Sequence, residues 1–446
     1  MISALAPTVF VIAFALLTRR ILLSLVLGLV LGELLFAWDV RDGLLGVIDR
    51  VLGVFADPGN TAVVVFCVLV GGLLALVREN GGVAGFVRLV SRSPALETRR
   101  GTELFVIAIG CLIFIESSIT SLVAGTVGRP LFDRHGISRE KLAYIADSTS
   151  APICLLLPMN AWGAFILGLL ADTGEALPLL LRSLPLSFYA FAAIAMVFVS
   201  ALLGWDFGPM RRATPRPPAE SIGDVGEGRA RGLLVPVVAM VALVPIGLYV
   251  TGGGDFFRGS GARSVLYAVL GGSAIAAFFL VVDAKRPARD VLPVFLRGAR
   301  ELLSLGALVT LAIAFGALSK DLDTGPTIAS IVSAALDPRL TAAALFVTAS
   351  LIAFATGTSW GTFALTIPLA LPLAEQTGLP PALMIGAALS GGVFGDHASP
   401  ISDTTLVSAI AAGCEPIDHV RTQLPYALVA AAIAAAAYVI VGAAAL

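Results

Sequence analysis

Apolar runs of about 17 or more residues recur along the whole chain, and they constrain its fold more than any other feature. A run of that length can cross the hydrocarbon core of a bilayer as one helix. Of the 446 residues, 58% are hydrophobic and only 13% are charged, whereas about a quarter of the residues in a soluble domain are charged. We therefore expect an all-α polytopic membrane protein.

The rest of the composition argues against several other classes of protein. The net charge is −1 at pH 7, so the overall charge does not suggest a nucleic-acid partner. The four cysteines lie in or beside apolar runs without a CxxC spacing, which predicts neither a disulfide framework nor a zinc site. No cofactor is expected beyond Na⁺ or H⁺ as coupling ions. Arg19 and Arg20 follow the apolar N-terminus, which favours a retained first span over a cleaved signal.

Ten apolar stretches are candidate membrane spans, and two more are interrupted by polar residues. The ten candidate spans are, approximately, 3–18, 21–38, 61–77, 142–170, 184–204, 233–250, 264–283, 302–319, 382–411 and 425–445. The interrupted stretches are 104–131, with polar residues at Glu116–Ser121, and 341–373, with polar residues at Thr356–Thr362. Each of them can be one broken helix or a re-entrant hairpin with its tip at the polar residues.

The charge of the loops distinguishes these alternatives, because Lys and Arg accumulate in short cytoplasmic loops. The basic loops are 78–103, 132–141, 205–231 and 284–300, whereas 39–60, 171–183 and 320–340 are acidic or balanced. If both interrupted stretches crossed the membrane, loops 78–103 and 132–141 would lie on opposite sides. If both are hairpins, every basic loop lies inside. We therefore expect ten spans plus two hairpins in the cell (inner) membrane, with both termini outside.

Five spans and a hairpin, repeated once, make the second half inverted relative to the first. A shift of 242 residues maps Ser117 onto Ser359, Thr120 onto Thr362 and Ser148 onto Ser390. The expected organisation is a first repeat at 1–204, a cytoplasmic linker at 205–231 and a second repeat at 232–446, each with one hairpin and one broken helix (about 142–170 and 382–411). Paired inverted repeats with discontinuous helices are typical of secondary transporters, whose site lies near the midplane.

Four polar clusters in the apolar stretches are the candidate site. Ionisable groups at membrane depth are functional candidates by default. A hard cation such as Na⁺ prefers oxygen ligands, and Pro152 and Pro400 are expected to break their helices and release backbone carbonyls. The candidate cation- or substrate-binding residues are Glu116, Ser117, Ser118, Thr120, Asp147, Ser148, Thr149, Ser150, Asn160, Thr356, Thr358, Ser359, Trp360, Thr362, Asp396, His397, Ser399, Asp403 and Thr404.

Each of these residues also has a structural interpretation. A lone hydroxyl in a membrane helix often bonds a carbonyl one turn earlier in the same helix. Asp147 could cap the N-terminus of a half-helix. Trp162 could line a substrate cavity together with Asn160, or belong to an interfacial aromatic belt. His397 could orient Asp396 or titrate with it, and His419 is expected to lie in the loop before the last span, with a structural or gating role.

A short pattern also raises an enzymatic alternative. Gly357-Thr-Ser-Trp-Gly361 fits the G-x-S-x-G nucleophile pattern, and Asp396 and His397 follow it in the chain. That motif requires a strand–turn–helix context, which an interrupted apolar stretch does not offer. An intramembrane serine hydrolase is thus a remote alternative, and we do not expect an enzyme.

Several longer stretches resemble the NhaC-type sodium/proton antiporter family, within a broader ion-transporter superfamily. The resemblance is carried by Gly357–Phe363, Gly395–Thr405 and Asp418–Tyr426 in the second half, and by Gly125–Leu131, Ile137–Thr149 and Ala151–Cys154 in the first. It implies a carrier driven by a sodium or proton gradient, with paired hairpins and alternating access. Many relatives carry paired aspartates where this chain has Ile115-Glu-Ser-Ser118.

Two transport functions follow as hypotheses. The first is sodium/proton antiport, in which Asp396, Asp147 or Glu116 binds Na⁺ or H⁺ but not both. The second is sodium-coupled transport of a small organic solute such as an organic acid, amino acid or amine, suggested by the altered hairpin and by Asn160, Trp162 and Trp360. The expected partners are the lipid bilayer and these ions or solutes, without nucleic acid, and the superfamily adds a homodimer by analogy.

Overall fold

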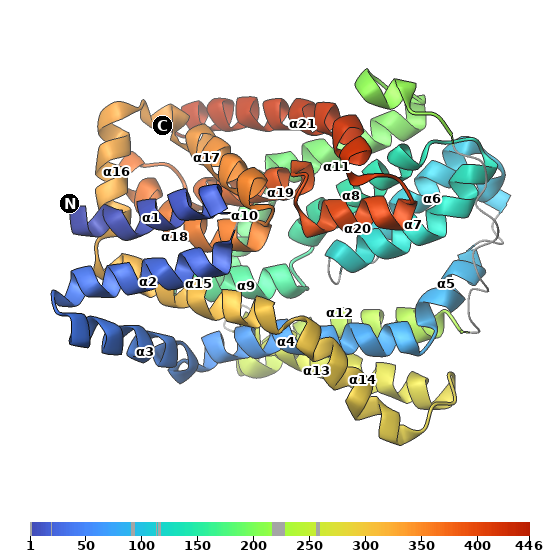
Figure 1. Ribbon diagram of the computed structural model, residues 1–446, viewed down its shortest axis with the longest axis horizontal. Helices are drawn as coiled ribbons and strands as arrows, with labels where there is room; N and C mark the ends of the chain where they lie inside the picture. Colours follow the sequence, from blue (N-terminus) through green and yellow to red (C-terminus); the bar gives the residue numbers. More distant parts are fainter. Residues whose placement is uncertain are drawn as a thin grey trace.

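The computed structural model describes residues 2–18, 20–90, 94–112, 114, 117–215, 228–255 and 259–446. These residues form helices and short connections, and none of the described residues belongs to a strand. Most helices run roughly parallel to the longest axis of the molecule (Figure 1). The all-α architecture expected from the apolar runs is confirmed.

Seven helices of the described part are long and apolar enough to cross a membrane. They are α4 (Pro58–Glu79), α11 with the following 3-10 turn η4 (Phe188–Arg212), α12 (Arg231–Thr251), α13 (Gly261–Val282), α15 (Leu303–Asp321), α17 with the preceding turn η7 (Pro338–Thr356) and α21 (Pro416–Ala445). The first two predicted spans are the shorter helices α1 (Ile2–Thr18) and α2 (Ile21–Ala37). The molecule is therefore a multi-pass membrane protein.

The two interrupted stretches fold as pairs of helices that reverse direction. The first pair is α6 (Arg99–Leu112) and α7 (Ser117–Arg134), and the second is α17 and α18 (Ser359–Thr377). Figure 1 shows the second pair entering from the end of the molecule that holds both termini, and the first pair entering from the opposite end. The second pair turns at Gly357, which is buried, as expected of a hairpin whose tip lies in the interior.

Two predicted spans are broken helices, but one break is displaced from its predicted place. The second is α19 (Pro381–Ala398) followed by α20 (Asp403–Ala412), and Pro400 lies in the break as predicted. The first is α8 (Arg139–Leu156) followed by α9 (Ala161–Leu169), so Pro152 lies inside α8 and the prediction that it breaks the helix is wrong. A membrane helix tolerates an internal proline where neighbouring groups satisfy the released carbonyl.

Equivalent helices of the two halves begin at a constant separation along the sequence. Helices α6 and α17 begin at Arg99 and Thr341, which are 242 residues apart. Helices α7 and α18, α8 and α19, and α9 and α20 begin with the same separation. The shift of 242 residues therefore aligns whole elements as well as single residues. This spacing and the opposite entry of the hairpins are what an inverted repeat predicts; the repeat itself stays a prediction.

Five further helices occupy segments that were predicted to be loops. They are α3 (Val40–Ala56), α5 (Gly82–Val90), α10 (Ala176–Ser183), α14 (Val291–Glu301) and α16 (Thr324–Ala335). Charged residues lower the mean hydropathy of α3 and α14, so neither segment contains an apolar run that would predict a helix there. Both still expose large apolar side chains, including Leu44 and Ile48 on α3 and Leu292 and Leu296 on α14. Such helices suit the membrane–water interface.

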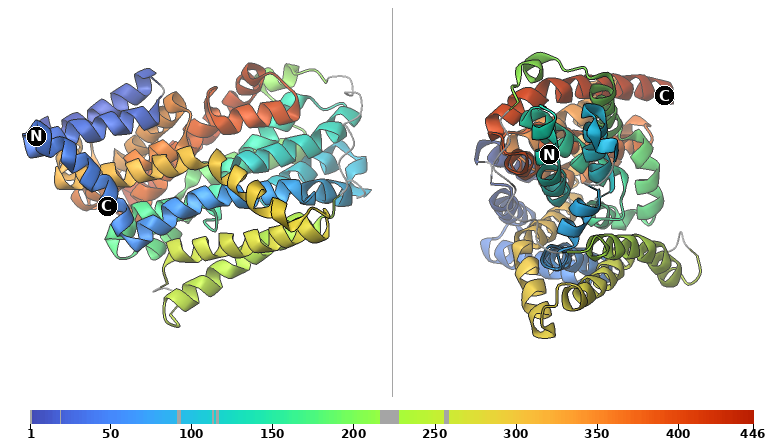
Figure 2. Two further views of the ribbon diagram at one scale, coloured as in Figure 1. Left: turned by 60° about the horizontal axis from the view of Figure 1, so that its bottom comes forward. Right: turned by 90° about the vertical axis from the view of Figure 1, so that its right-hand side faces the viewer.

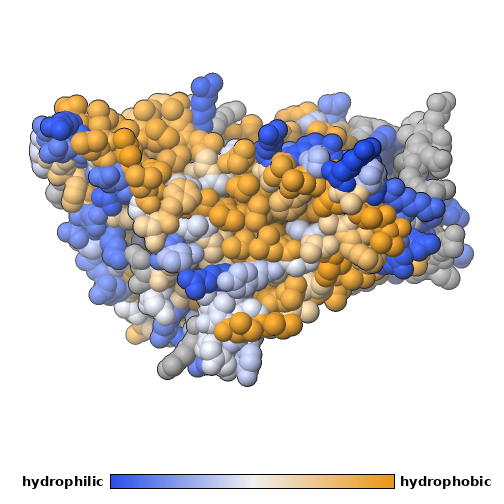
Figure 3. Space-filling view, turned by 90° about the horizontal axis from the view of Figure 1, so that it is seen from below, coloured by the Kyte–Doolittle hydropathy of each residue, from blue (hydrophilic) through white to orange (hydrophobic). Residues whose placement is uncertain are grey.

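The surface is consistent with a membrane-embedded middle. In Figure 3 apolar residues cover much of the middle of the face seen from below, and hydrophilic residues gather mainly toward the two ends. Figures 1 and 2 place both termini at one end, and the turn η4 (Gly208–Arg212) and the start of α12 toward the other. The four basic loops all join helices at this second end, which agrees with the predicted clustering of basic loops on one side.

Candidate functional site

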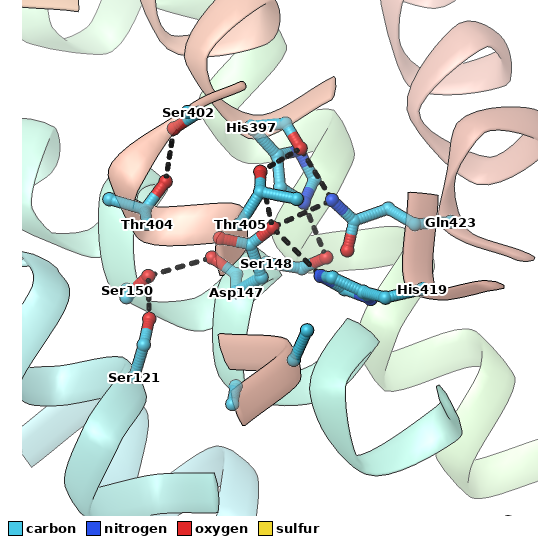
Figure 4. A network of polar contacts seen from close by, with 12 residues as sticks. Ser121, Asp147, Ser148, Ser150, His397, Ser402, Thr404, Thr405, His419 and Gln423 are labelled. Atoms are coloured by element: carbon cyan, nitrogen blue, oxygen red, sulfur yellow. Dashed lines mark hydrogen bonds and ion pairs between the residues drawn. The ribbon is translucent and has the colours of Figure 1, made fainter. Parts of the chain in front are cut away.

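Three helices, α8, α19 and α21, bring polar side chains together in the interior, and Figure 4 shows the part of this network around Asp147. Helix α8 contributes Asp147, α19 contributes Asp396 and His397, and α21 contributes Gln423 and His419. These five side chains are 0–2% exposed. Because burying an ionisable or polar group is costly unless it is paired, their convergence marks this region as the candidate site.

Asp147 accepts contacts from two other helices through a single oxygen. Its Oδ2 accepts a hydrogen bond from the Gln423 amide at 2.7 Å and lies 3.3 Å from Nε2 of His419. The Thr405 hydroxyl is at 3.4 Å from the same oxygen. The other oxygen, Oδ1, has no hydrogen-bond partner among the described residues. Asp147 lies in the middle of α8, so the interpretation as an N-cap is wrong.

Asp396 joins the second hairpin to the second helix break. Its Oδ2 accepts a hydrogen bond from the Ser359 hydroxyl at 2.9 Å, and its Oδ1 accepts one from Ser402 at 2.6 Å. Ser402 is in turn 3.0 Å from the Thr404 hydroxyl. Ser359 is the first residue of α18, and Ser402 immediately precedes α20. The hydroxyls of Ser359 and Ser402 thus contact this carboxylate from two elements, and the Thr404 hydroxyl lies next to that of Ser402.

The backbone of the second hairpin packs directly against the same break. Gly357 has a φ of +67°, and a Cβ atom there would lie 2.8 Å from the carbonyl oxygen of Ile401. The Ser399 hydroxyl donates to the carbonyl oxygen of Phe354 at 2.7 Å. Glycine is needed at residue 357 both for its left-handed conformation and for this close approach. The hairpin therefore reaches Asp396 because no side chain separates the two backbones.

His397 connects four helices and is not part of a catalytic triad. Its Nε2 is 2.8 Å from the Ser148 hydroxyl on α8, and its Nδ1 is 2.6 Å from the Tyr189 hydroxyl on α11. Its backbone carbonyl accepts a hydrogen bond from Gln423 on α21. Since both ring nitrogens are engaged and Ser359 bonds Asp396 instead, the nucleophile–base pair of a serine hydrolase does not form.

The Asn160 side chain connects the first helix break to the first hairpin through hydrogen bonds. Its side-chain oxygen caps α9 by accepting hydrogen bonds from the backbone N–H groups of residues 162 and 163, at 2.9 and 3.2 Å. Its amide donates to the carbonyl oxygens of Cys154 at 2.7 Å and Phe114 at 3.1 Å. The next aromatic residue, Trp162, is 1% exposed and packs edge-on against Trp360 and Phe363, so it is not part of an interfacial belt.

Other predicted residues lie around the site without facing its carboxylates. The hydroxyls of Thr149, Thr356 and Thr362 each donate to a carbonyl oxygen four residues earlier, as lone membrane hydroxyls often do. Ser150 bonds Ser121 and the backbone carbonyl of Asp147 (Figure 4). Ser117 and Thr120 are buried in α7, and Thr358 precedes α18 without a side-chain cap. Glu116 and the side chains of Ser118 and Asp403 lie outside the described residues.

Sequence reasoning missed several members of this network. Gln423, Thr405, Ser402 and Tyr189 were not singled out, and His419 was expected in a loop. That last expectation is wrong, because α21 begins at Pro416 and His419 is completely buried. One signal was available: residues 419 and 423 are four apart, so both face the same side of a helix that starts earlier than its apolar run.

Comparisons with known proteins agree with the membrane architecture. The sequence model of the Na+/H+ antiporter family matches residues 170–443. An uncharacterized protein of Haemophilus influenzae is 32% identical over 474 aligned residues, which cover 98% of this chain and 90% of that protein. A malate-2H(+)/Na(+)-lactate antiporter of Bacillus subtilis is 33% identical over 141 residues, 32% of this chain and 29% of that antiporter.

A solved structure shares the fold at low sequence identity. The Alcanivorax borkumensis YdaH transporter superposes with a TM-score of 0.59 at 16% identity, covering 97% of this chain and 98% of that one. At this identity the likeness concerns the fold alone. It shows that a transporter of known structure has a similar overall fold.

Proposed function

This chain belongs to the Na+/H+ antiporter family, and we propose that it exchanges Na⁺ for H⁺ by alternating access. It is a membrane transporter and not an enzyme. The observation that carries the proposal is the environment of Asp396, where the hydroxyls of Ser359 and Ser402 meet a completely buried carboxylate.

The donor atoms at Asp396 suit Na⁺. Carboxylate and hydroxyl oxygens are the ligands that hard cations prefer, and Thr404 adds a third hydroxyl next to Ser402. The break between α19 and α20 also frees backbone carbonyls near the same point. A proton and a sodium ion each neutralise a buried carboxylate, so the two ions compete for Asp396. This competition is the requirement for exchange.

Asp147 supplies the second carboxylate of the exchange. Its Oδ1 and the Oε1 of Gln423 are buried acceptors without a hydrogen-bond partner among the described residues. Leaving a buried acceptor unsatisfied costs about 1–3 kcal/mol. A proton or a cation bound at Asp147 would satisfy its free oxygen, so we assign the second ion-binding position to Asp147.

Transport in vesicles tests the proposal. Na⁺ added to vesicles that hold a pH gradient should dissipate the gradient when the wild-type chain is present, as followed with a pH-sensitive dye. Asp396→Asn keeps the size of the side chain but removes its charge, and it should abolish the response without loss of inserted protein. The control Asp42→Asn changes an exposed aspartate of α3 and should leave the response intact. A wild-type response in Asp396→Asn would disprove the role of Asp396.

A second candidate function is sodium-coupled transport of a small organic solute. It is favoured by the buried indole Nε1 of Trp162, which has no hydrogen-bond partner among the described residues. This donor belongs to an aromatic cluster with Trp360 and Phe363, beside the second hairpin. The printed name of the Bacillus subtilis relative also couples organic acids to Na⁺ and H⁺ in that protein.

A thermal-shift matrix of solutes with and without Na⁺ separates the two functions. A solute that stabilises the purified protein only in the presence of Na⁺ would support sodium-coupled solute transport, because a ligand that binds the folded state raises its unfolding temperature. Stabilisation by Na⁺ alone, with no response to carboxylic acids, amino acids or amines, would support Na⁺/H⁺ exchange.

A further inference from the structure

A polar cavity of about 1040 Å³ lies outside the buried network, at the end of the molecule opposite to the termini. It is formed by the 3-10 turn η4 (Gly208–Arg212) with the residues that follow it, the start of α8 and the start of α21. Three arginines line it, Arg211, Arg212 and Arg421, together with Glu140, Asp418 and Thr422. None of these residues has a part in the ion-binding positions assigned above.

The three arginines are available for a ligand. Each is exposed, and none makes a hydrogen bond or an ion pair with another described residue. By contrast, Glu140 already interacts with its own surroundings and is 6% exposed. Guanidinium groups in a common cavity repel one another unless an anion lies between them, and their planar donors match the oxygens of a phosphate in pairs.

The backbone reinforces this preference for an anion. Helices α8 and α21 begin at Arg139 and Pro416, so the N-terminal turns of both border the cavity through Glu140 and Asp418. The N-terminus of a helix carries a partial positive charge and favours bound anions. The two carboxylates occupy part of that field, and both Glu140 and Asp418 remain as negative groups beside the three arginines.

We propose that this cavity binds a phosphate-bearing anion through Arg211, Arg212 and Arg421. The ligand is either the headgroup of an anionic phospholipid or a soluble phosphorylated molecule, because the arginines recognise the phosphate that both share. The site does not depend on which ion the protein transports, so it can fail while the proposed exchange stands.

Binding to the purified full-length protein tests the site with two probes. Inorganic phosphate at constant ionic strength represents a soluble ligand, and its binding is read from the rise in unfolding temperature. Phosphatidylglycerol against phosphatidylcholine represents a lipid headgroup, and its retention is read by native mass spectrometry. Binding of phosphate alone identifies a soluble ligand, and binding of phosphatidylglycerol alone identifies a lipid; either result, or both, supports the site.

Variants connect the binding to these residues. The double variant Arg212→Gln/Arg421→Gln should bind the effective probe at least tenfold more weakly. It should unfold at the wild-type temperature without the probe, since neither side chain has a partner among the described residues. Asp418→Asn should bind more tightly because it removes a like charge from the ligand's surroundings.

Arg289→Gln is the matched control. This arginine is exposed near the same end of the molecule, outside the cavity, and its substitution should leave binding unchanged. The proposal is overturned if neither probe binds to the wild-type protein. It is also overturned if the double variant binds as tightly as the wild type does, or if Arg289→Gln weakens binding equally.

Discussion

At the scale of single residues, the two hydroxyl groups that donate to Asp396 distinguish it from the other buried polar groups of the described residues. Ser359 and Ser402 each donate to one of its oxygens, whereas most hydroxyls in the surrounding helices donate to their own backbone. Removing either donor should weaken Na⁺ binding, since a hydrogen bond to a charged group contributes about 1.5–3 kcal/mol. These two serines are therefore the sharpest test of the geometry at Asp396.

We expect Ser359→Ala and Ser402→Ala to raise the Na⁺ concentration for half-maximal exchange by about tenfold, the equivalent of 1.4 kcal/mol. Ser350→Ala makes the same change at a buried hydroxyl that bonds the carbonyl of Phe346 in its own helix, and it should have little effect. The measurement is the Na⁺ dependence of dye dequenching in vesicles. An equal effect of all three substitutions would contradict a specific role for the two serines.

Gln423 is the second residue whose removal should be decisive. Its amide donates both to Asp147 and to the carbonyl of His397, so Gln423→Leu leaves two buried acceptors short of a donor. We expect at least a tenfold loss of exchange and a lower unfolding temperature. Gln376→Leu, at an exposed residue near the end of α18, is the control. Wild-type exchange in Gln423→Leu would show that the contact with Asp147 is dispensable.

At the scale of elements, two glycines allow the contact between the second hairpin and the second break to be tested with a matched pair of variants. Gly357 and Gly378 end α17 and α18 in the same left-handed conformation, with φ of +67° and +75°. A Cβ at residue 357 would meet the carbonyl of Ile401 at 2.8 Å, but at residue 378 it would meet only a side-chain atom at 3.5 Å.

Both Gly→Ala variants should therefore lose about 1–2 kcal/mol of stability from the backbone conformation alone. Only Gly357→Ala should also reduce exchange, by tenfold or more, because the added methyl group holds the hairpin away from the break. Stability is measured by thermal unfolding and exchange in vesicles. Equal exchange in the two variants would show that the close approach at Ile401 has no functional importance.

Substitutions of Asn160 separate its two roles at the first break: its oxygen caps α9, and its amide donates hydrogen bonds to carbonyl oxygens of neighbouring segments. Asn160→Ser keeps a side-chain oxygen for the cap of α9 but loses the amide that donates to Cys154 and Phe114, while Asn160→Ala loses both. Loss of the cap alone costs about 1 kcal/mol. We expect Asn160→Ala to unfold at the lower temperature of the two and Asn160→Ser to lie between it and the wild type. The reverse order would contradict the capping role.

Much of the arrangement of helices could be predicted from the sequence. Run length located the spans, and loop charge identified the hairpins. The position of the first break could not be predicted, because Pro152 and Pro158 are equally good helix breakers and only tertiary packing decides between them. Asp396 and Asp147 were found because a buried carboxylate is rare. Gln423 and His419 were missed because α21 begins before its apolar part, in a segment with the composition of a loop.

At the scale of the whole molecule, the basic loops gather at the end opposite to both termini (Figure 2). From this clustering the positive-inside rule predicts that the termini lie outside the cell. In a variant without its native cysteines, a membrane-impermeant thiol reagent added outside should label Ala443→Cys and should not label Arg289→Cys. Labelling of the second position alone would reverse the predicted orientation, although it would leave the geometry of the site unchanged.

The binding of Na⁺ to the purified protein tests most directly whether Asp396 holds the transported ion. Replacing K⁺ by Na⁺ at constant ionic strength should raise the unfolding temperature of the wild type and of the control Asp42→Asn, because Na⁺ binds only the folded state. Asp396→Asn should show no difference between the two salts. If Na⁺ stabilises Asp396→Asn as much as the wild type, the ion binds elsewhere and the site proposed at Asp396 is wrong.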